Sequence, residues 1–131
     1  MAERRLRWAV VIVDPDPVEG HEQGGSRRVL VVSNEPFHRS GLMTICPITS
    51  QWTVPRYDNE VPIPKGHAGQ TRDGVILCHQ VRTVSIERIQ TVEIGRDGIQ
   101  YVTDPSIKAA VREALSAHFG LNIPLTVDTR P

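Results

Sequence analysis

The sequence predicts a mostly β protein with one C-terminal helix, folded as a small antiparallel barrel or a strongly bent sheet. Two observations support this fold class. Short apolar runs rich in β-branched residues alternate with loops rich in proline and glycine, and the clearest helical periodicity lies near the end of the chain. Short strands joined by polar turns are typical of small barrels, on which a terminal helix can pack.

Length and charge limit the class of protein further. The 131 residues are enough for one core, so we expect a single domain over residues 1–124 and a flexible tail over residues 125–131. The hydrophobic fraction of 39% argues against general disorder. Fifteen basic residues balance fifteen acidic ones, so a nucleic-acid site would have to be a local patch.

Compartment and redox state follow from the apolar runs and the cysteines. No run reaches the roughly 18 apolar residues of a membrane span, and no signal-peptide core follows the N-terminus. We therefore expect a cytoplasmic protein with no membrane contact. Cys46 and Cys78 each lie in an apolar run without the spacing of a metal site, which predicts buried, reduced thiols.

Three strands are predicted in the first half of the chain. The first covers Arg7–Asp14, a short β-branched run that ends at a loop, Asp14–Gly20, containing two prolines and a glycine. The second strand covers Arg28–Ser33. The third covers Leu42–Thr49, and its Pro47 suggests an edge strand or a bulge.

Further strands are predicted in the second half. Prolines and glycines divide Ser50–Gly74, which leaves room for one short strand, Glu60–Ile63, among loops that we expect to be mobile. A single strand over Val75–Val84 begins as an apolar run and then alternates between apolar and polar residues. Another strand is predicted over Ile89–Ile94.

The helix comes last and has signals at both ends. Asp104 is the predicted N-cap, Pro105 the first helical residue and Gly120 the C-terminal glycine. An apolar stripe is expected to pack on the sheet. It consists of Ile107, Val111, Ala114 and His118. His118 is accordingly interpreted as a hydrogen-bonded core histidine rather than a catalytic one.

A polar stretch directly before the second strand is the main candidate for a functional site. It reads His21-Glu22-Gln23-Gly24-Gly25-Ser26-Arg27-Arg28. The two glycines permit a tight turn or close approach of the backbone to a ligand. The β-branched run that follows would hold Arg27 on a rigid strand rather than on a mobile loop.

Four sequence blocks occur in a fixed order along most of the chain. They are Asp14-x-Asp16-Pro17-x-x-Gly20-His21-Glu22-Gln23-Gly24-Gly25-x-Arg27, Val29-Leu30-Val31-Val32-Ser33-Asn34, Pro47-Ile48-Thr49-Ser50 and Cys78-x-Gln80-x-Arg82-Thr83. Together these blocks resemble the MazF/PemK/Kid family of bacterial toxin ribonucleases. The helix ending in Glu113-Ala114-Leu115 and His118-x-Gly120-Leu121 is also similar to that family.

The resemblance implies a fold, an activity and partners. The fold would be an SH3-like antiparallel barrel of the MazF/CcdB type with a C-terminal helix. The activity would be sequence-specific cleavage of single-stranded RNA without a metal or other cofactor, by the toxin of a type II toxin–antitoxin system. The partners would be a second copy of the chain, in a homodimer, and a cognate antitoxin protein.

Metal-free RNA cleavage needs a base for the 2′-OH proton, an acid for the leaving 5′ oxygen and donors for the phosphate oxygens. The candidates that match the family are Arg27, Thr49, Glu22 and His21. An arginine offers planar donors that fit a phosphate, and His21 has an ordinary pKa suited to a base near neutral pH. The alternative is that Arg27 pairs with a surface carboxylate and Thr49 merely ends a strand.

A second set of polar residues could line a groove for phosphates and base edges. It comprises Gln23, Arg28, Ser50, Gln51, Gln80 and Arg82. Trp52 and Tyr57, in the loop after the third strand, could stack on unpaired bases. Alternatively, Trp52 covers the core or a dimer partner.

Three departures from the family pattern bear on the site. Trp8-Ala9 replaces the usual Gly-Asp, Arg28 replaces a proline, and His79 stands where Kid-like members carry an aspartate. His79 is either a second histidine near the site or a strand residue that faces solvent. Two other functions stay open. One is a gyrase poison of the CcdB type, which would share the fold and against which the presence of Arg27 and Thr49 argues. The other, suggested by Arg28 and His79, is a degenerate homologue that only binds antitoxin.

Overall fold

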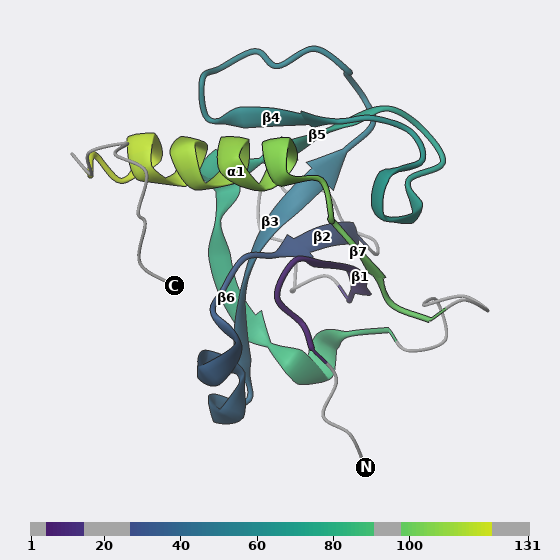
Figure 1. Ribbon diagram of the computed structural model, residues 1–131. Coiled ribbons are helices and arrows are strands. Elements are labelled where there is room, and N and C mark those ends of the chain that lie inside the picture. Colours follow the sequence, from purple (N-terminus) through teal and green to yellow (C-terminus); the bar gives the residue numbers. More distant parts are fainter. Residues whose placement is uncertain (1–4, 15–26, 91–97, 122–131) are drawn as a thin grey trace, which may run out of the picture.

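In the computed structural model, which describes residues 5–14, 27–90 and 98–121, short strands are followed by one C-terminal helix (Figure 1). The strands are β1 (Ala9–Val13), β2 (Arg27–Val31), β3 (Leu42–Thr49), β4 (Glu60–Ile63), β5 (Gly74–Leu77), β6 (Arg82–Ser85) and β7 (Gln100–Tyr101), and the helix is α1 (Pro105–His118). The predicted class, mostly β with a C-terminal helix, is confirmed.

The strands form one antiparallel sheet that bends at β3. Its order is β4-β5-β3-β2-β1-β7, and β6 also pairs with β3. The first half of β3 pairs with β6, ending at Ile45 opposite Arg82, whereas its last two residues, Ile48 and Thr49, pair with β5. Pro47 lies between these two sets of pairs, where a missing N–H costs no ladder bond to either partner. β3 is therefore a central strand, not the edge strand that Pro47 suggested, and its register with β2 runs from Ile45 to Pro47 without the extra residue of a bulge.

The sheet packs an apolar cluster on each side. One cluster lies under α1, which runs along one side of the sheet beside β4 (Figure 1). The helix buries Ile107, Val111 and Ala114 in it, as its stripe predicts. The second cluster fills the curl of the sheet, and its members are Leu6, Ala9, Val11, Val13, Val29, Val31, Met43, Ile45 and Val84. Within the described ranges, no helix is long and apolar enough to cross a membrane.

The ends of α1 follow the predicted signals. The Asp104 side chain accepts a hydrogen bond from the Ser106 N–H at 2.7 Å, and Pro105 begins the helix. Gly120 has a φ of +66°, which a glycine adopts without strain. His118, however, is exposed and shares a 3.2 Å hydrogen bond with Asn59. The interpretation of His118 as a core histidine is wrong, because the last helical turn extends past the sheet that α1 covers.

Both cysteines are free thiols with no exposed surface, in the cluster beneath α1. A hydrogen bond between the two thiols and burial together raise the pKa of Cys46. The expectation of buried, reduced cysteines is confirmed, and both thiols serve packing.

The segment predicted as one strand over Val75–Val84 is divided. A 3₁₀ helix, Cys78–Gln80, separates β5 from β6, because these strands pair with opposite halves of β3 and the chain must cross between them. Of the predicted strand Ile89–Ile94, Ile89 forms a single bridge with Val13, and residues 91–94 lie outside the described residues. The 3₁₀ helix Glu35–Ser40 and the strand β7 were not predicted either.

Trp8 adopts a left-handed backbone, with a φ of +69°, at the position where the family pattern has glycine. Such a backbone costs a non-glycine residue about 1 kcal/mol. Burial offsets this cost, because the Trp8 side chain is only 6% exposed and packs under α1. The cationic groups of Lys108 and Arg112 lie 5.6 and 5.3 Å from the centre of its ring, so the tryptophan also helps to fix the helix.

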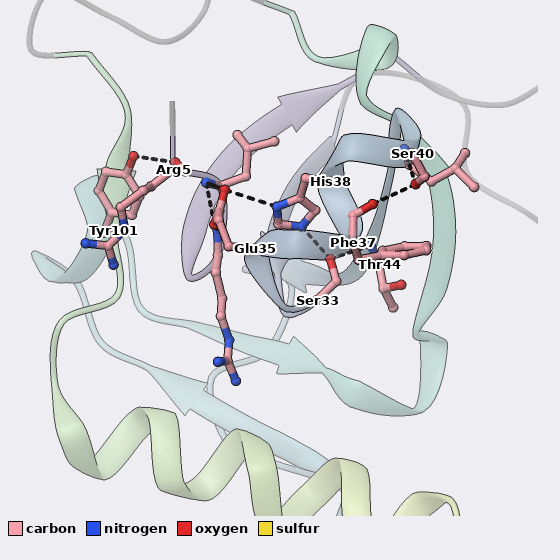
Figure 2. Close-up of polar contacts among 11 residues, drawn as sticks. Arg5, Ser33, Glu35, Phe37, His38, Ser40, Thr44 and Tyr101 are labelled. Carbon is pink, nitrogen blue, oxygen red and sulfur yellow. Dashed lines mark hydrogen bonds and ion pairs between the residues drawn. The ribbon is translucent and has the colours of Figure 1, made fainter. Parts of the chain in front are cut away.

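The 3₁₀ helix Glu35–Ser40 fastens the N-terminal segment to the sheet (Figure 2). The Glu35 carboxylate accepts hydrogen bonds from the backbone N–H groups of Leu6 and Arg7 and contacts His38 Nδ1 at 3.2 Å. Burial opposes ionisation of Glu35, but the two amides and His38 outweigh it and hold the pKa of this carboxyl below its usual range. The carboxylate therefore acts as an anchor.

His38 also contacts Ser33, which gives an array of serine, histidine and glutamate that resembles a hydrolytic triad (Figure 2). The Ser33 hydroxyl lies 2.7 Å from His38 Nε2. It also accepts a 2.9 Å hydrogen bond from the Thr44 N–H, so the serine joins β3 to the loop after β2. Ser33 and Glu35 are thus engaged with backbone N–H groups, and the His38 imidazole bridges their side chains, so the array is a structural clamp.

Candidate functional site

Arg27 and Thr49 lie at the same end of the neighbouring strands β2 and β3. Val29 of β2 and Pro47 of β3 are directly opposite each other. Arg27 precedes Val29 by two residues, and Thr49 follows Pro47 by two residues. Because alternate residues of a strand point to the same face, both side chains lie on the face that carries this pair. Both residues are half-buried. The structure therefore brings together the two principal residues that the sequence singled out.

The start of β6 adds a second arginine to this face. Arg82 lies opposite Ile45, and residues opposite each other share a face. Along β3, alternation places Ile45 on the same side as Thr49. Arg82 is exposed, as is Gln80 in the preceding 3₁₀ helix. Two guanidinium groups and one hydroxyl thus lie on one side of the sheet.

Thr49 is held where β3 enters the following loop. Its hydroxyl accepts a hydrogen bond of 3.2 Å from the Gln51 N–H, and the exposed residues Ser50 and Gln51 continue the same edge. Gly74, at the start of β5, allows the backbone to approach here. A Cβ at Gly74 would lie 2.7 Å from the Thr49 carbonyl oxygen and 3.4 Å from the Ser50 hydroxyl.

We expect Gly74→Ala to disturb this edge. The added methyl group would meet backbone rather than a flexible side chain, so β3 and β5 must separate. Overpacking of this kind costs about 1–3 kcal/mol in the free energy of unfolding. Urea denaturation measures the loss, and a variant as stable as the original protein would show that the two strands tolerate the methyl group.

Arg28 points away from Arg27, because neighbouring residues on a strand face opposite sides. Its guanidinium donates hydrogen bonds to the Gly69 carbonyl at 3.2 Å and to the Gln70 side-chain oxygen at 3.1 Å. Gln70 is only 5% exposed. Arg28 thus holds the loop before β5, and the structure does not bring its side chain to the face with Arg27 and Thr49.

Arg28→Ala is expected to loosen this loop and to lower the free energy of unfolding by about 1 kcal/mol, the usual net value of such hydrogen bonds. Arg39→Ala is the matched control, since Arg39 is exposed on the 3₁₀ helix Glu35–Ser40. Denaturation curves of the two variants can be compared directly. Equal stability of both would contradict the role assigned to Arg28.

The remaining predicted residues, His21, Glu22 and Gln23, lie outside the described residues. Among the described residues, no group of three or more histidine, cysteine, aspartate or glutamate side chains is placed to hold a metal ion.

A buried carboxylate that the sequence analysis missed lies beside the loop after Thr49. Glu60, at the start of β4, is only 4% exposed. It accepts hydrogen bonds from Trp52 Nε1 at 3.1 Å and from the Arg56 N–H at 2.9 Å, and it lies 2.8 Å from His79 Nε2. The expectation that His79 is a strand residue facing solvent is wrong. His79 lies on the 3₁₀ helix Cys78–Gln80, and its imidazole contacts the Glu60 carboxylate.

Burial opposes ionisation of Glu60, but the Arg56 amide, His79 and the Trp52 indole hold the pKa of this carboxyl below its usual range. The charge is therefore kept inside the protein by three donors from two separate segments. Such an arrangement fixes the loop over residues 50–59 relative to the 3₁₀ helix that carries His79 and Gln80. No local pattern in the sequence marks this network, since His79 lies 19 residues from Glu60.

Comparisons with known proteins identify the family of the chain. A family model described as PemK-like, MazF-like toxin of type II toxin-antitoxin system matches residues 6–119. Endoribonuclease MazF of Staphylococcus saprophyticus is 29% identical over 117 residues, which cover 88% of this chain and 92% of that protein.

Solved structures that this chain matches are also MazF proteins. MazF from Deinococcus radiodurans (Form-I) is 28% identical, with a TM-score of 0.66 over 87% of this chain and 94% of that one. A MazE-MazF structure (Form-II) from the same organism is 27% identical, with a TM-score of 0.67, and the match covers 91% of this chain and 99% of that one. Since the family model matches most of the sequence, the chain belongs to the PemK-like, MazF-like toxins of type II toxin-antitoxin systems.

Proposed function

We propose that this chain is a metal-independent endoribonuclease that cleaves single-stranded RNA in the cytoplasm as the toxin of its system. The observation that carries the proposal is the common face of Arg27, Thr49 and Arg82. Two guanidinium groups and a hydroxyl can bind the oxygens of one phosphodiester and its neighbour. A relative that matches most of this chain is named an endoribonuclease.

In the proposed reaction, a base removes the proton of a 2′-OH, and the oxygen attacks the adjacent phosphorus. The bond from phosphorus to the 5′ oxygen breaks, and an acid protonates the leaving oxygen. The products are a 2′,3′-cyclic phosphate and a 5′-OH. Arg27 and Thr49 donate to the phosphate oxygens, whose negative charge increases in the transition state. We assign the base and the acid to the pair Glu22 and His21.

The RNA on either side of the cut would lie along the edge that continues from Thr49. Ser50 and Gln51 follow Thr49 directly, and Gln80 precedes Arg82 by two residues; all of these except Thr49 are exposed. We include Gln23 in the same groove. Arg28 contributes indirectly, by holding the loop before β5 against the opposite side of the sheet.

We further propose a homodimer whose activity is blocked by a cognate antitoxin. A MazE-MazF structure is among the solved structures that this chain matches. Light scattering at micromolar concentration should give the mass of two chains, and a mass of one chain would contradict the dimer.

Purified protein incubated with a long RNA in excess EDTA tests the proposed activity. We expect fragments that begin with a 5′-OH, whose ends also reveal the sequence that is cut. Intact RNA would contradict the proposal. Inhibition of gyrase under conditions in which RNA remains whole would instead favour a protein-binding toxin of the CcdB type.

A further inference from the structure

We propose that the stacked pair of Trp52 and Arg56 is a subsite for one unpaired base of the RNA, next to the site of cleavage. This inference rests on the proposed ribonuclease function. The subsite would bind a nucleobase by stacking, so it would contribute affinity and selectivity rather than chemistry.

The two side chains already form a platform. The guanidinium carbon of Arg56 lies 3.6 Å from the centre of the Trp52 ring, a contact distance at which the guanidinium covers the ring. Trp52 is half-buried, whereas Arg56 is exposed. Unpaired bases stack on aromatic rings and on guanidinium planes in RNA-binding proteins. The exposed guanidinium offers a base such a surface.

Glu60 holds this platform rigidly. One carboxylate oxygen, Oε1, accepts both the Trp52 indole N–H and the Arg56 backbone N–H. The other, Oε2, lies 2.8 Å from His79 Nε2. A preformed surface binds a base without the cost of ordering the loop. The buried carboxylate thus explains why two side chains of an irregular loop have a fixed relation to each other.

A second aromatic ring lies beside the platform. Tyr57 is 64% exposed, and its ring meets that of His79 edge to face, with 5.9 Å between the centroids. His79 is itself fixed by Glu60. A planar guanidinium and an exposed aromatic ring, both beside one buried carboxylate, suit a nucleobase better than they suit an aliphatic peptide side chain.

The platform is connected to the proposed cleavage face at two points. Trp52 follows Thr49 by three residues, and the Gln51 amide between them bonds to the Thr49 hydroxyl. On the other side, His79 is the neighbour of Gln80. A strand of RNA whose phosphate lies at Arg27 and Thr49 could therefore place an adjacent base on Arg56.

The test uses the full chain and an RNA oligonucleotide that contains the mapped cleavage sequence, made resistant by a 2′-deoxy nucleotide at the cut. 2-Aminopurine is placed in turn at each position around the cut, because its fluorescence is quenched when it stacks. We expect strong quenching at one position on binding to the original protein. Arg56→Lys, which keeps the charge but removes the plane, should abolish the quenching at that position.

With a cleavable RNA, Arg56→Lys should raise KM about 5- to 160-fold, the change that corresponds to the loss of one stacked base, and leave kcat nearly unchanged. Arg39→Lys is the matched control, and thermal melting checks that both variants fold. Quenching and KM equal to those of the original protein would overturn the subsite. So would a variant that loses affinity only for the antitoxin.

These outcomes are distinct from failure of the proposed function. If the original protein leaves every RNA intact, the ribonuclease proposal fails and the subsite fails with it. If the original protein cuts RNA and Arg56→Lys cuts with the same KM, only the subsite is wrong.

Discussion

Arg27→Ala is expected to lower kcat for RNA cleavage by about 10²- to 10³-fold, the loss that follows removal of one donor to a developing oxyanion. Arg27 begins β2 and shares a face with Thr49, so its guanidinium is held on a strand rather than on a loop. A rigid donor stabilises the transition state without reorganisation. Single-turnover cleavage of an RNA with one cut site, in excess protein, measures the effect on chemistry alone.

Two further variants make this result specific. Arg39→Ala removes an exposed arginine from the 3₁₀ helix Glu35–Ser40 and should cut like the original protein. Arg27→Lys keeps the charge but loses the planar pair of donors, so its rate should lie between those of the original protein and Arg27→Ala. A rate for Arg27→Ala within threefold of the original would contradict the role proposed for Arg27.

Glu60→Ala is expected to lower the free energy of unfolding by about 3 kcal/mol. The substitution leaves the indole of Trp52, the amide of Arg56 and the imidazole of His79 without their acceptor. Breaking a buried hydrogen-bonded ionic network typically costs this much. Urea denaturation measures the loss, and Glu60→Gln, which keeps one acceptor of nearly the same shape, should lose less.

The pH dependence of this loss has a defined sign. The pKa of Glu60 lies below its usual range in the folded protein, so its ionised form stabilises the fold above the ordinary pKa of 4.5. That contribution disappears as the pH falls through the lower, folded-state value. The difference in stability between the original protein and Glu60→Gln should therefore be largest near neutral pH and shrink in acid. A difference that stays constant into acid would contradict an ionised Glu60.

Much of the fold was predictable because its signals are local. Alternation and β-branched runs gave the strands, and Asp104, Pro105 and Gly120 gave both ends of the helix. The break between β5 and β6 was not predictable, since an apolar run followed by alternation looks like one strand. It depends on which half of β3 each segment pairs with, and that pairing is a property of the whole sheet.

The candidate site was likewise predictable only where its signals are local. Both Arg27 and Arg28 were predicted to contact RNA, the first as a catalytic residue and the second in the groove. Alternation alone places their side chains on opposite faces of β2, and the hydrogen bonds of Arg28 to Gly69 and Gln70 agree with this separation. The Glu60 network could not be read from the sequence, because its donors come from a loop and from a distant 3₁₀ helix. The partners of this carboxylate can be identified only from the folded chain, because folding brings the loop and the 3₁₀ helix together.

The central claim is that this chain cuts RNA through its 2′-OH at the face of Arg27 and Thr49. One measurement tests it most directly: cleavage, in excess EDTA, of an RNA oligonucleotide and of the same oligonucleotide with a single 2′-deoxy nucleotide on the 5′ side of the cut. The account predicts that the RNA is cut to a cyclic phosphate and a 5′-OH while the deoxy version stays whole. Cleavage of both at equal rates, or of neither, would contradict it.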